Sequence, residues 1–176
     1  DTHIDVVYAS DLARAYQTAK AVADQHGLPV HTHPGLREIA GGEWEDVPFA
    51  ELPERFPESY RDWVDAPYAL ALPGGETMAA FQHRLVQTVS ELVARHEGQT
   101  ICIATHGTAI RALVCYFYGE PLTYLNNIRW YDNASVTEIW VDGDRFDVVT
   151  EGDNAHLGDT TTLGKQTWWK RDGEEP

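Results

Sequence analysis

ICIATHGTAIRALVCYF occupies residues 101–117 and changes its hydrophobic pattern at one histidine, His106. The four residues before Thr105 are all apolar, which is typical of a parallel strand that is covered on both faces. From Gly107 to Tyr118 apolar residues recur at helical spacing, and Gly119-Glu120-Pro121 ends this pattern. The stretch therefore predicts a buried strand that leads through His106 into a helix.

Short apolar strands and helical patterns alternate along the rest of the chain. A β-branched run at residues 4–9 precedes a helical pattern at residues 12–26, which we expect Ser10 or Asp11 to cap. A longer helix is predicted over residues 77–96, and Asp142-Gly143-Asp144 predicts a hairpin. The alternation indicates an α/β layered domain.

The chain length of 176 residues and the hydrophobic content of 43% predict one domain, residues 1–176. Within it, residues 41–75 have a different texture, because prolines interrupt short helical patterns. This segment is expected to be an irregular helical excursion over the sheet. Its prolines are Pro48, Pro53, Pro57, Pro67 and Pro73.

The chain is strongly acidic, with a formal net charge of −15. Its field would repel nucleic acids and anionic membranes, so neither is an expected partner, and a phosphate site must be a local basic pocket. Cys102 and Cys115, the two cysteines, both lie in apolar runs and are expected to be buried core residues. A disulfide framework is therefore not expected, which favours a cytoplasmic location.

Two places combine a strand end, a helix start and a residue suited to phosphate. Arg14 falls in the first turn of a predicted helix, where a cation is unfavourable unless an anion binds beside it. His106 ends a strand, and the Gly107 and Thr108 amides after it could cradle phosphoryl oxygens while Gly107 permits a tight turn. Taken singly, Arg14 could equally be a solvated surface residue and His106 a core histidine.

Five segments in order resemble motifs of the histidine phosphatase superfamily, the phosphoglycerate mutase-like enzymes. The resemblance extends to about His156, and the order of the motifs makes it specific. The segments are Asp5–Ala19, Leu36-Arg37-Glu38-Ile39 with Gly42, Trp44 and Glu45, Pro73-Gly74-Gly75-Glu76-Thr77, Ala104–Leu113, and Asp132–Thr137.

The resemblance implies a three-layer α/β sandwich with a mostly parallel central sheet flanked by helices, and phosphoryl transfer through a phosphohistidine. Arg14 would bind phosphate, His106 would be a cationic, charge-stabilising histidine, and Glu38 would be the general acid, a role that needs a raised pKa. Without the motif around it, Glu38 would be interpreted as an exposed loop carboxylate. No cofactor and no metal are implied.

The sequence departs from the family pattern in one respect: it contains no Arg-His-Gly, the motif that carries the nucleophilic histidine, and His3 cannot replace it. We therefore expect the first strand of the fold to be missing from this chain, upstream residues to exist, and this chain alone to be inactive. In the family that strand lies beside the strand that ends at His106, so its absence would leave an apolar slot in the sheet.

The leading functional hypothesis is hydrolysis of a small phosphorylated metabolite, with inorganic phosphate as a further ligand and a homodimer left open. Mutase-type phosphoryl transfer is the first alternative, and the short excursion at residues 41–75 disfavours it. A pseudoenzyme that binds a phospho-ligand without turnover is the second alternative, and a purely structural or interaction domain is the third.

Two further features of the sequence carry weaker hypotheses. His31 and His33 could lie on one face of a strand and suggest a metal site, but no carboxylate or cysteine is near, so surface positions on an edge strand are favoured. Trp168-Trp169, with Lys170 and Arg171, could fold over the pocket, although packing against the core is preferred.

Overall fold

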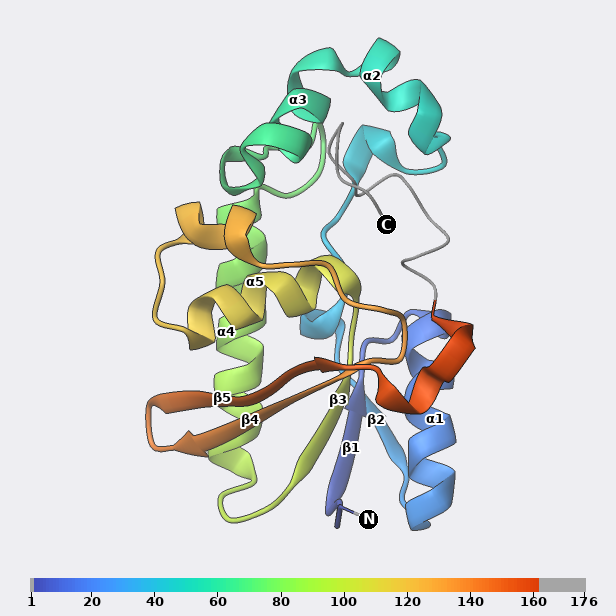
Figure 1. The fold of residues 1–176 in the computed structure, drawn as a ribbon, viewed down its shortest axis with the longest axis vertical. Helices are drawn as coiled ribbons and strands as arrows, with labels where there is room; N and C mark the ends of the chain where they lie inside the picture. Colours follow the sequence, from blue (N-terminus) through green and yellow to red (C-terminus); the bar gives the residue numbers. More distant parts are fainter. Residues whose placement is uncertain (1, 162–176) are drawn as a thin grey trace.

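The computed structural model describes residues 2–161, and its centre is a parallel sheet of three short strands (Figure 1). The strands are β1 (Val6–Ala9), β2 (Val30–Thr32) and β3 (Ile101–Ala104), in the order β2-β1-β3. In the register of this sheet, Ala9 pairs with both Thr32 and Ala104. The carboxyl ends of all three strands therefore meet at one edge.

Helices cover both faces of this sheet. α1 (Ala13–His26) lies on one face, while α4 (Met78–Arg95) and α5 (Gly107–Phe117) lie on the other (Figure 1). Alternate residues of β1 serve the two sides: Val7 packs in a cluster with alanines of α1, and Tyr8 packs in the larger cluster of α4 and α5. The architecture is the three-layer α/β fold that the sequence predicts.

The helix over residues 78–95 follows its sequence pattern closely. Thr77 caps α4, since its hydroxyl oxygen accepts a hydrogen bond from the Ala80 amide at 3.1 Å. The apolar stripe of the helix is buried as predicted, and at most 6% of any of its side chains is exposed. Its members are Met78, Phe81, Leu85, Val89 and Leu92.

Strand β3 is less buried than its apolar sequence predicts. Ile101 and Ile103 pack toward α4 and α5, and Cys102 and Ala104 pack toward α1, so both faces are covered. All four residues nevertheless remain partly exposed. Within residues 2–161 β3 pairs only with β1, so its second edge has no neighbouring strand.

The excursion between residues 41 and 75 consists of short helical turns, drawn at the top of Figure 1. Prolines occupy the first turns of its two α-helices, where a missing N–H costs nothing. The turns are η2 (Gly42–Trp44), η3 (Phe49–Glu51), α2 (Leu52–Arg55), α3 (Pro57–Asp65) and η4 (Pro67–Ala69).

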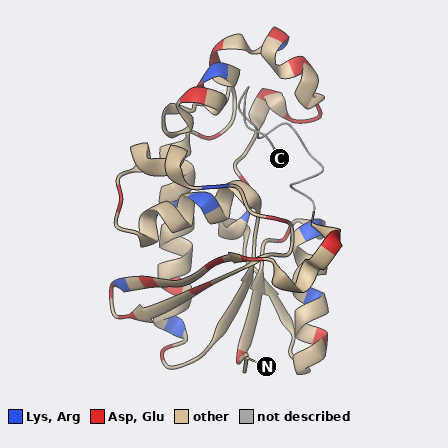
Figure 2. Ribbon diagram, viewed as in Figure 1, with Lys and Arg blue, Asp and Glu red and all other residues tan. Residues whose placement is uncertain are grey.

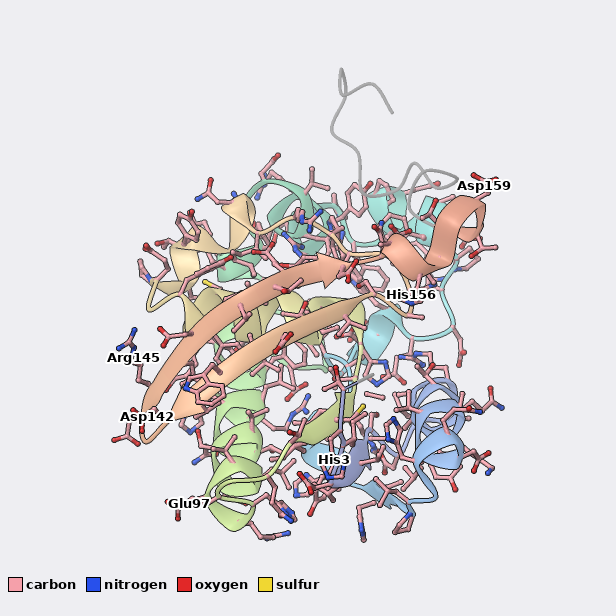
Figure 3. All side chains as sticks on the ribbon, turned by 60° about the horizontal axis from the view of Figure 1, so that its bottom comes forward. His3, Glu97, Asp142, Arg145, His156 and Asp159 are labelled. Atoms are coloured by element: carbon pink, nitrogen blue, oxygen red, sulfur yellow. The ribbon has the colours of Figure 1, made fainter. Side chains whose placement is uncertain are left out.

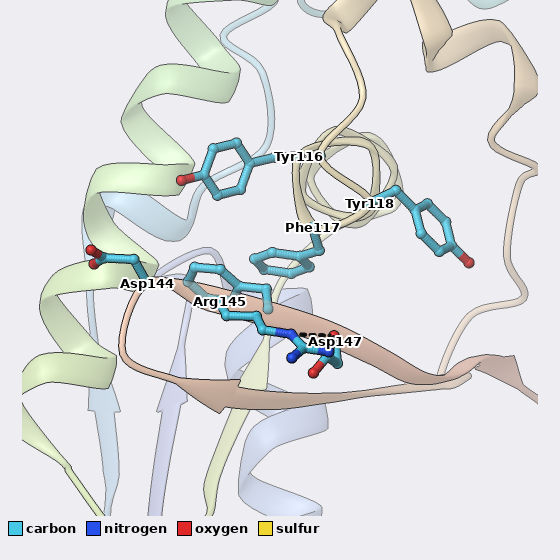
Figure 4. Close-up of a pocket in the computed structure, with 8 residues that line it drawn as sticks. Tyr116, Phe117, Tyr118, Asp144, Arg145 and Asp147 are labelled. Atoms are coloured by element: carbon cyan, nitrogen blue, oxygen red, sulfur yellow. Dashed lines mark hydrogen bonds and ion pairs between the residues drawn. The ribbon is translucent and has the colours of Figure 1, made fainter.

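A separate antiparallel hairpin pairs β4 (Val136–Asp142) with β5 (Arg145–Asp153), as the sequence predicts. Gly143 at its tip has φ +59°, a conformation that suits glycine. The hairpin packs on the end of α5 (Figure 4). The ring of Phe117 stacks there on that of Phe146, with 4.8 Å between the ring centroids. Three further 3₁₀ turns complete the described chain: η1 (Pro34–Leu36), η5 (Leu122–Asn127) and η6 (Ala155–Thr160).

The structure corrects two expectations about single residues. Neither Ser10 nor Asp11 caps α1, whose N-cap is Leu12 without a side-chain hydrogen bond, because both polar side chains are used elsewhere in the site. Cys115 is buried as expected, but Cys102 is only partly buried because it lies on the strand with an open edge. Both thiols are free.

Acidic residues are spread over the excursion and the hairpin (Figure 2). Across residues 2–161, no helix combines the length and the apolar content that crossing a membrane requires.

Candidate active site

Three loops meet where the parallel strands end, which is the usual location of ligand sites in open α/β sheets. The first loop joins β1 to α1, the second follows β2, and the third joins β3 to α5. The hydroxyl of Thr105 in the third loop donates to the Leu36 carbonyl in the second at 2.8 Å. The loops thus form one connected surface. Glu38 and His106 lie on the second and third loops, and Arg14 lies in the first turn of α1, directly after the first loop.

His106 is buried at the N-terminus of α5, and its backbone is extended there. Its Nε2 atom lies 2.8 Å from the hydroxyl of Ser10, which is also buried. Burial lowers the pKa of His106 to about 4, and the positive charges of Arg14 and Arg84 act in the same direction. The histidine is therefore neutral near pH 7 in this structure, which contrasts with the cationic form expected from the sequence.

Glu38 is partly buried and is bound by backbone amides. Its carboxylate accepts one hydrogen bond from the Ile39 amide at 2.9 Å and another from the Thr108 amide at 3.1 Å. Burial nevertheless raises the pKa of Glu38 above its usual value, against the opposing effects of these bonds and of Arg14. A carboxyl group that keeps its proton to higher pH is suited to general acid chemistry.

Arg14 is exposed in the first turn of α1. Its charge lowers the pKa of both His106 and Glu38, so the guanidinium lies close enough to influence both groups. Arg14 thus places a cation beside a helix N-terminus and a neutral His106, in a corner of an otherwise acidic protein. Such a cation is suited to a phosphate dianion.

The two backbone amides predicted to hold phosphate differ in the structure. Gly107 does not adopt a positive φ, and a Cβ there would meet only the ring of Trp130 at 3.6 Å, so glycine is not required by a tight turn. The Thr108 amide already donates to Glu38. Binding of phosphate by the Thr108 amide therefore stays a prediction and requires the Glu38 carboxylate to move.

Three polar contacts at this site have no counterpart in the sequence predictions. The sequence predicts Ser10 only as a helix cap, but its hydroxyl contacts His106. Asp11 accepts two hydrogen bonds of 2.6 Å from Arg37, which joins the first loop to the second. The third contact is made by Arg84 of α4 to the backbone of the loop that carries Glu38. These residues are far apart in the sequence, so no local pattern predicts the contact.

The remaining histidines considered lie apart from this site. His3 precedes β1, at the opposite end of the sheet from His106, and contacts Asp5 at 3.0 Å (Figure 3). His31 is exposed on the edge strand β2, and the Nδ1 atom of His33 accepts from the Gly35 amide. No cluster of three or more metal-ligating side chains occurs within residues 2–161, and Trp168 to Arg171 lie outside the residues that the structure describes.

A surface pocket lies at the other end of α5, between its last turn and the hairpin (Figure 4). It is lined by the aromatic residues Tyr116 to Tyr118, at and just after the end of α5, and by Arg145 and Asp147, which form an ion pair at 2.9 Å. Because α5 has eleven residues, this pocket is about 16 Å from His106 along the helix axis. It is therefore separate from the strand-end site.

Comparison with known proteins agrees with this geometry. A phosphoserine phosphatase 1 from Hydrogenobacter thermophilus is 32% identical over 157 residues, which cover 89% of this chain and 74% of that protein. The solved structure of Bacillus stearothermophilus YhfR superposes with a TM-score of 0.84 at 34% identity, covering 89% of this chain and 77% of that one.

A second solved structure contains a phosphate ligand. It is the complex of a mycobacterial glucosyl-3-phosphoglycerate phosphatase with inorganic phosphate, with a TM-score of 0.77, 26% identity, and coverage of 87% of this chain and 79% of that one. The family model of the histidine phosphatase superfamily (branch 1) matches residues 1–154. With the fold and the grouping of Arg14, Glu38 and His106, these matches mean that the chain belongs to the histidine phosphatase superfamily.

Proposed function

We propose that this protein hydrolyses small phosphomonoesters through a phosphohistidine intermediate. Arg14 and His106 hold the phosphoryl group, and Glu38 protonates the leaving oxygen. The observation that carries the proposal is the raised pKa of Glu38 at the same strand ends as Arg14 and His106. A carboxyl whose pKa is raised holds its proton to higher pH and can supply the proton that an alkoxide leaving group needs.

The reaction proceeds in two displacements. In the first, an imidazole nitrogen of the nucleophilic histidine attacks phosphorus, the ester P–O bond breaks, and the Glu38 proton goes to the leaving oxygen. In the second, water attacks the phosphohistidine, the P–N bond breaks, and the Glu38 carboxylate accepts the proton of the water. Glu38 is thereby restored as an acid, and inorganic phosphate leaves.

The nucleophilic histidine is proposed to come from outside these 176 residues, since they contain no Arg-His-Gly. The second edge of β3 supports this proposal, because no strand of residues 2–161 pairs there while Ile101 and Ile103 remain partly exposed. A parallel strand added at this edge would end beside His106.

The proposed substrates are small phosphorylated metabolites. Phosphoserine is the first to test, because the relative from Hydrogenobacter thermophilus is named a phosphoserine phosphatase. The net charge of −15 disfavours polyanionic substrates, which would be repelled before reaching the local positive field of Arg14. The two free cysteines support a reducing, cytoplasmic location.

The test uses the protein expressed from its complete reading frame, with phosphoserine and an aryl phosphate as substrates. Release of phosphate and an acid-labile phosphoenzyme are expected, and both should fall by about 100-fold or more in His106→Ala. Binding of phosphate without any turnover would instead establish the pseudoenzyme. Transfer of phosphate between substrate hydroxyls, with little release to water, would establish the mutase.

A further inference from the structure

Arg84 lies on α4, outside the three loops of the site, yet its guanidinium binds the loop that carries Glu38. We call residues 35–40 the acid loop. Arg84 Nη1 donates to the Gly35 carbonyl at 2.8 Å and to the Arg37 carbonyl at 3.2 Å, and Nη2 donates to the Glu38 carbonyl at 3.3 Å. One side chain therefore binds three carbonyls within four residues of the acid loop.

Glu76 completes this arrangement from the loop just before α4. Its carboxylate accepts from Arg84 Nε at 2.9 Å and Nη2 at 2.8 Å, and its Oε2 also accepts from the Ala40 amide at 2.9 Å. The backbone amide of Glu76 donates to the Ala40 carbonyl at 3.0 Å. Arg84 thus binds the acid loop from Gly35 to Glu38, and Glu76 binds it at Ala40.

The loop is also pressed against α4 by its backbone. A Cβ atom placed on Gly35 would lie 2.1 Å from the hydroxyl of Thr88, one helical turn after Arg84. Thr88 is buried, and its hydroxyl donates to the Arg84 carbonyl at 2.9 Å. The contact between the acid loop and α4 therefore leaves no room for the loop to shift toward the helix at this point.

A guanidinium suits this position because it offers five N–H donors in one rigid plane, which a lysine ammonium does not. Arg84 and Glu76 are both partly buried, with side-chain exposures of 27% and 22%. An ion pair so placed contributes less to stability than to fixing one arrangement of its neighbours. The arrangement that it fixes here is the backbone on either side of Glu38.

We propose that Arg84, held by Glu76, is a positioning residue that keeps the Glu38 carboxyl aimed at the leaving oxygen. The inference rests on the proposed function, because it assigns Arg84 a task only if Glu38 acts as the acid. Arg84 itself acts through the acid loop. Its loss should lower the efficiency of proton donation while leaving phosphate binding by Arg14 and His106 in place.

The experiment compares two substrates that differ in their need for an acid. The leaving group of phosphoserine is the alkoxide of serine, which needs a proton from the acid. The leaving group of 2,4-dinitrophenyl phosphate is a stable phenolate, which does not. With the full-length protein, Arg84→Met should lower kcat/KM for phosphoserine by about 100-fold, the cost of a misplacement near 1 Å. The loss for the dinitrophenyl ester should be less than about fivefold, as general acid catalysis predicts for such a leaving group.

Glu38→Gln should show the same selectivity more strongly, and Glu76→Gln should show it more weakly. Arg55→Met, which removes an arginine of an exposed ion pair on the excursion, is the matched control and should change neither rate. Arg84→Lys keeps the charge but not the fork of donors, and should fall between Arg84→Met and wild type. It replaces Arg84→Met if that variant does not fold.

The outcomes separate the two proposals. Equal losses on both substrates in the Arg84 variants, beside a selective loss in Glu38→Gln, would overturn the positioning role and leave the proposed function intact. Equal losses in Glu38→Gln itself would overturn the acid role of Glu38. Absence of turnover in the full-length wild-type protein would overturn the proposed function.

Discussion

The hydroxyl of Ser10 lies 2.8 Å from Nε2 of His106, in a contact between the ends of β1 and β3 that is closed to solvent. The same hydroxyl oxygen accepts a hydrogen bond from the Leu12 amide at 3.3 Å, which leaves the Ser10 proton for the imidazole. This arrangement suits a neutral histidine with its proton on Nδ1. Ser10 therefore links the β1–α1 loop to the tautomer of His106, that is, to which ring nitrogen carries the proton.

Replacement of Ser10 by alanine should destabilise the protein and impair phosphate binding. The imidazole would lose its buried partner, at a cost of about 1–3 kcal/mol in the free energy of unfolding. Urea denaturation measures the stability, and competition by vanadate measures the site. Ser90→Ala, at an exposed position on α4, is the control and should have an effect below about 0.5 kcal/mol. Equal effects of the two variants would contradict the role of Ser10.

The lowered pKa of His106 should make the protein sensitive to acid. Because the folded state keeps His106 neutral down to a pKa of about 4, against 6.5 for the free side chain, its contribution to stability is present above pH 6.5 and is lost as pH falls toward 4. The loss should be about 3 kcal/mol, since one pKa unit corresponds to about 1.4 kcal/mol.

Denaturation curves at several pH values check this expectation. His106→Asn should lack this part of the decline between pH 6.5 and 4, whereas His26→Asn, at an exposed position on α1, should keep the wild-type profile. Parallel declines in wild type and His106→Asn would show that another group is responsible.

Binding of a dianion should raise the pKa of His106 and draw a proton into the site. A neutral histidine beside an incoming negative charge gains a favourable interaction only in its protonated form. Sulfate is a suitable probe, because it is a dianion throughout the accessible pH range. Calorimetry at pH 6 in two buffers of different ionisation enthalpy should show proton uptake of up to about one per site. Zero uptake in wild type, or the same uptake in His106→Asn, would rule this coupling out.

Gly42 should be intolerant of a side chain. It has φ +58°, and a Cβ there would lie 2.2 Å from the Pro73 carbonyl oxygen, where η2 meets the loop before α4. Gly42→Ala should lower the free energy of unfolding by about 2–4 kcal/mol, since a backbone clash adds to the conformational cost. Gly143→Ala is the matched control: its φ is +59° but nothing lies within 4 Å, so about 1 kcal/mol is expected. Thermal denaturation of both variants measures these changes in stability. Similar losses of stability in the two variants would contradict the clash at Gly42.

Much of the fold was predictable because it depends on local patterns. The stripe of α4, its Thr77 cap and the turn at Gly143 are each encoded within a few consecutive residues. The order of strand and helix around His106 was equally local. The resemblance to the histidine phosphatase superfamily predicted that Arg14 and His106 serve one site, and the strand ends that meet at one edge agree with it.

The sequence by itself determined which side chains lie at the strand ends. Only the tertiary structure decided their burial, their hydrogen-bond partners and the resulting pKa shifts. The neutral state of His106 depends first on its burial and then on the nearby charge of Arg14, and its ring contacts Ser10, 96 residues away. The raised pKa of Glu38 depends on its burial in the folded chain, which outweighs the opposing hydrogen bond from the Thr108 amide, 70 residues away. Burial and electrostatic partners act through space, so periodicity and motifs can identify Glu38, His106 and Arg14 as candidate site residues but cannot predict the pKa shifts of Glu38 and His106 or their hydrogen-bond partners.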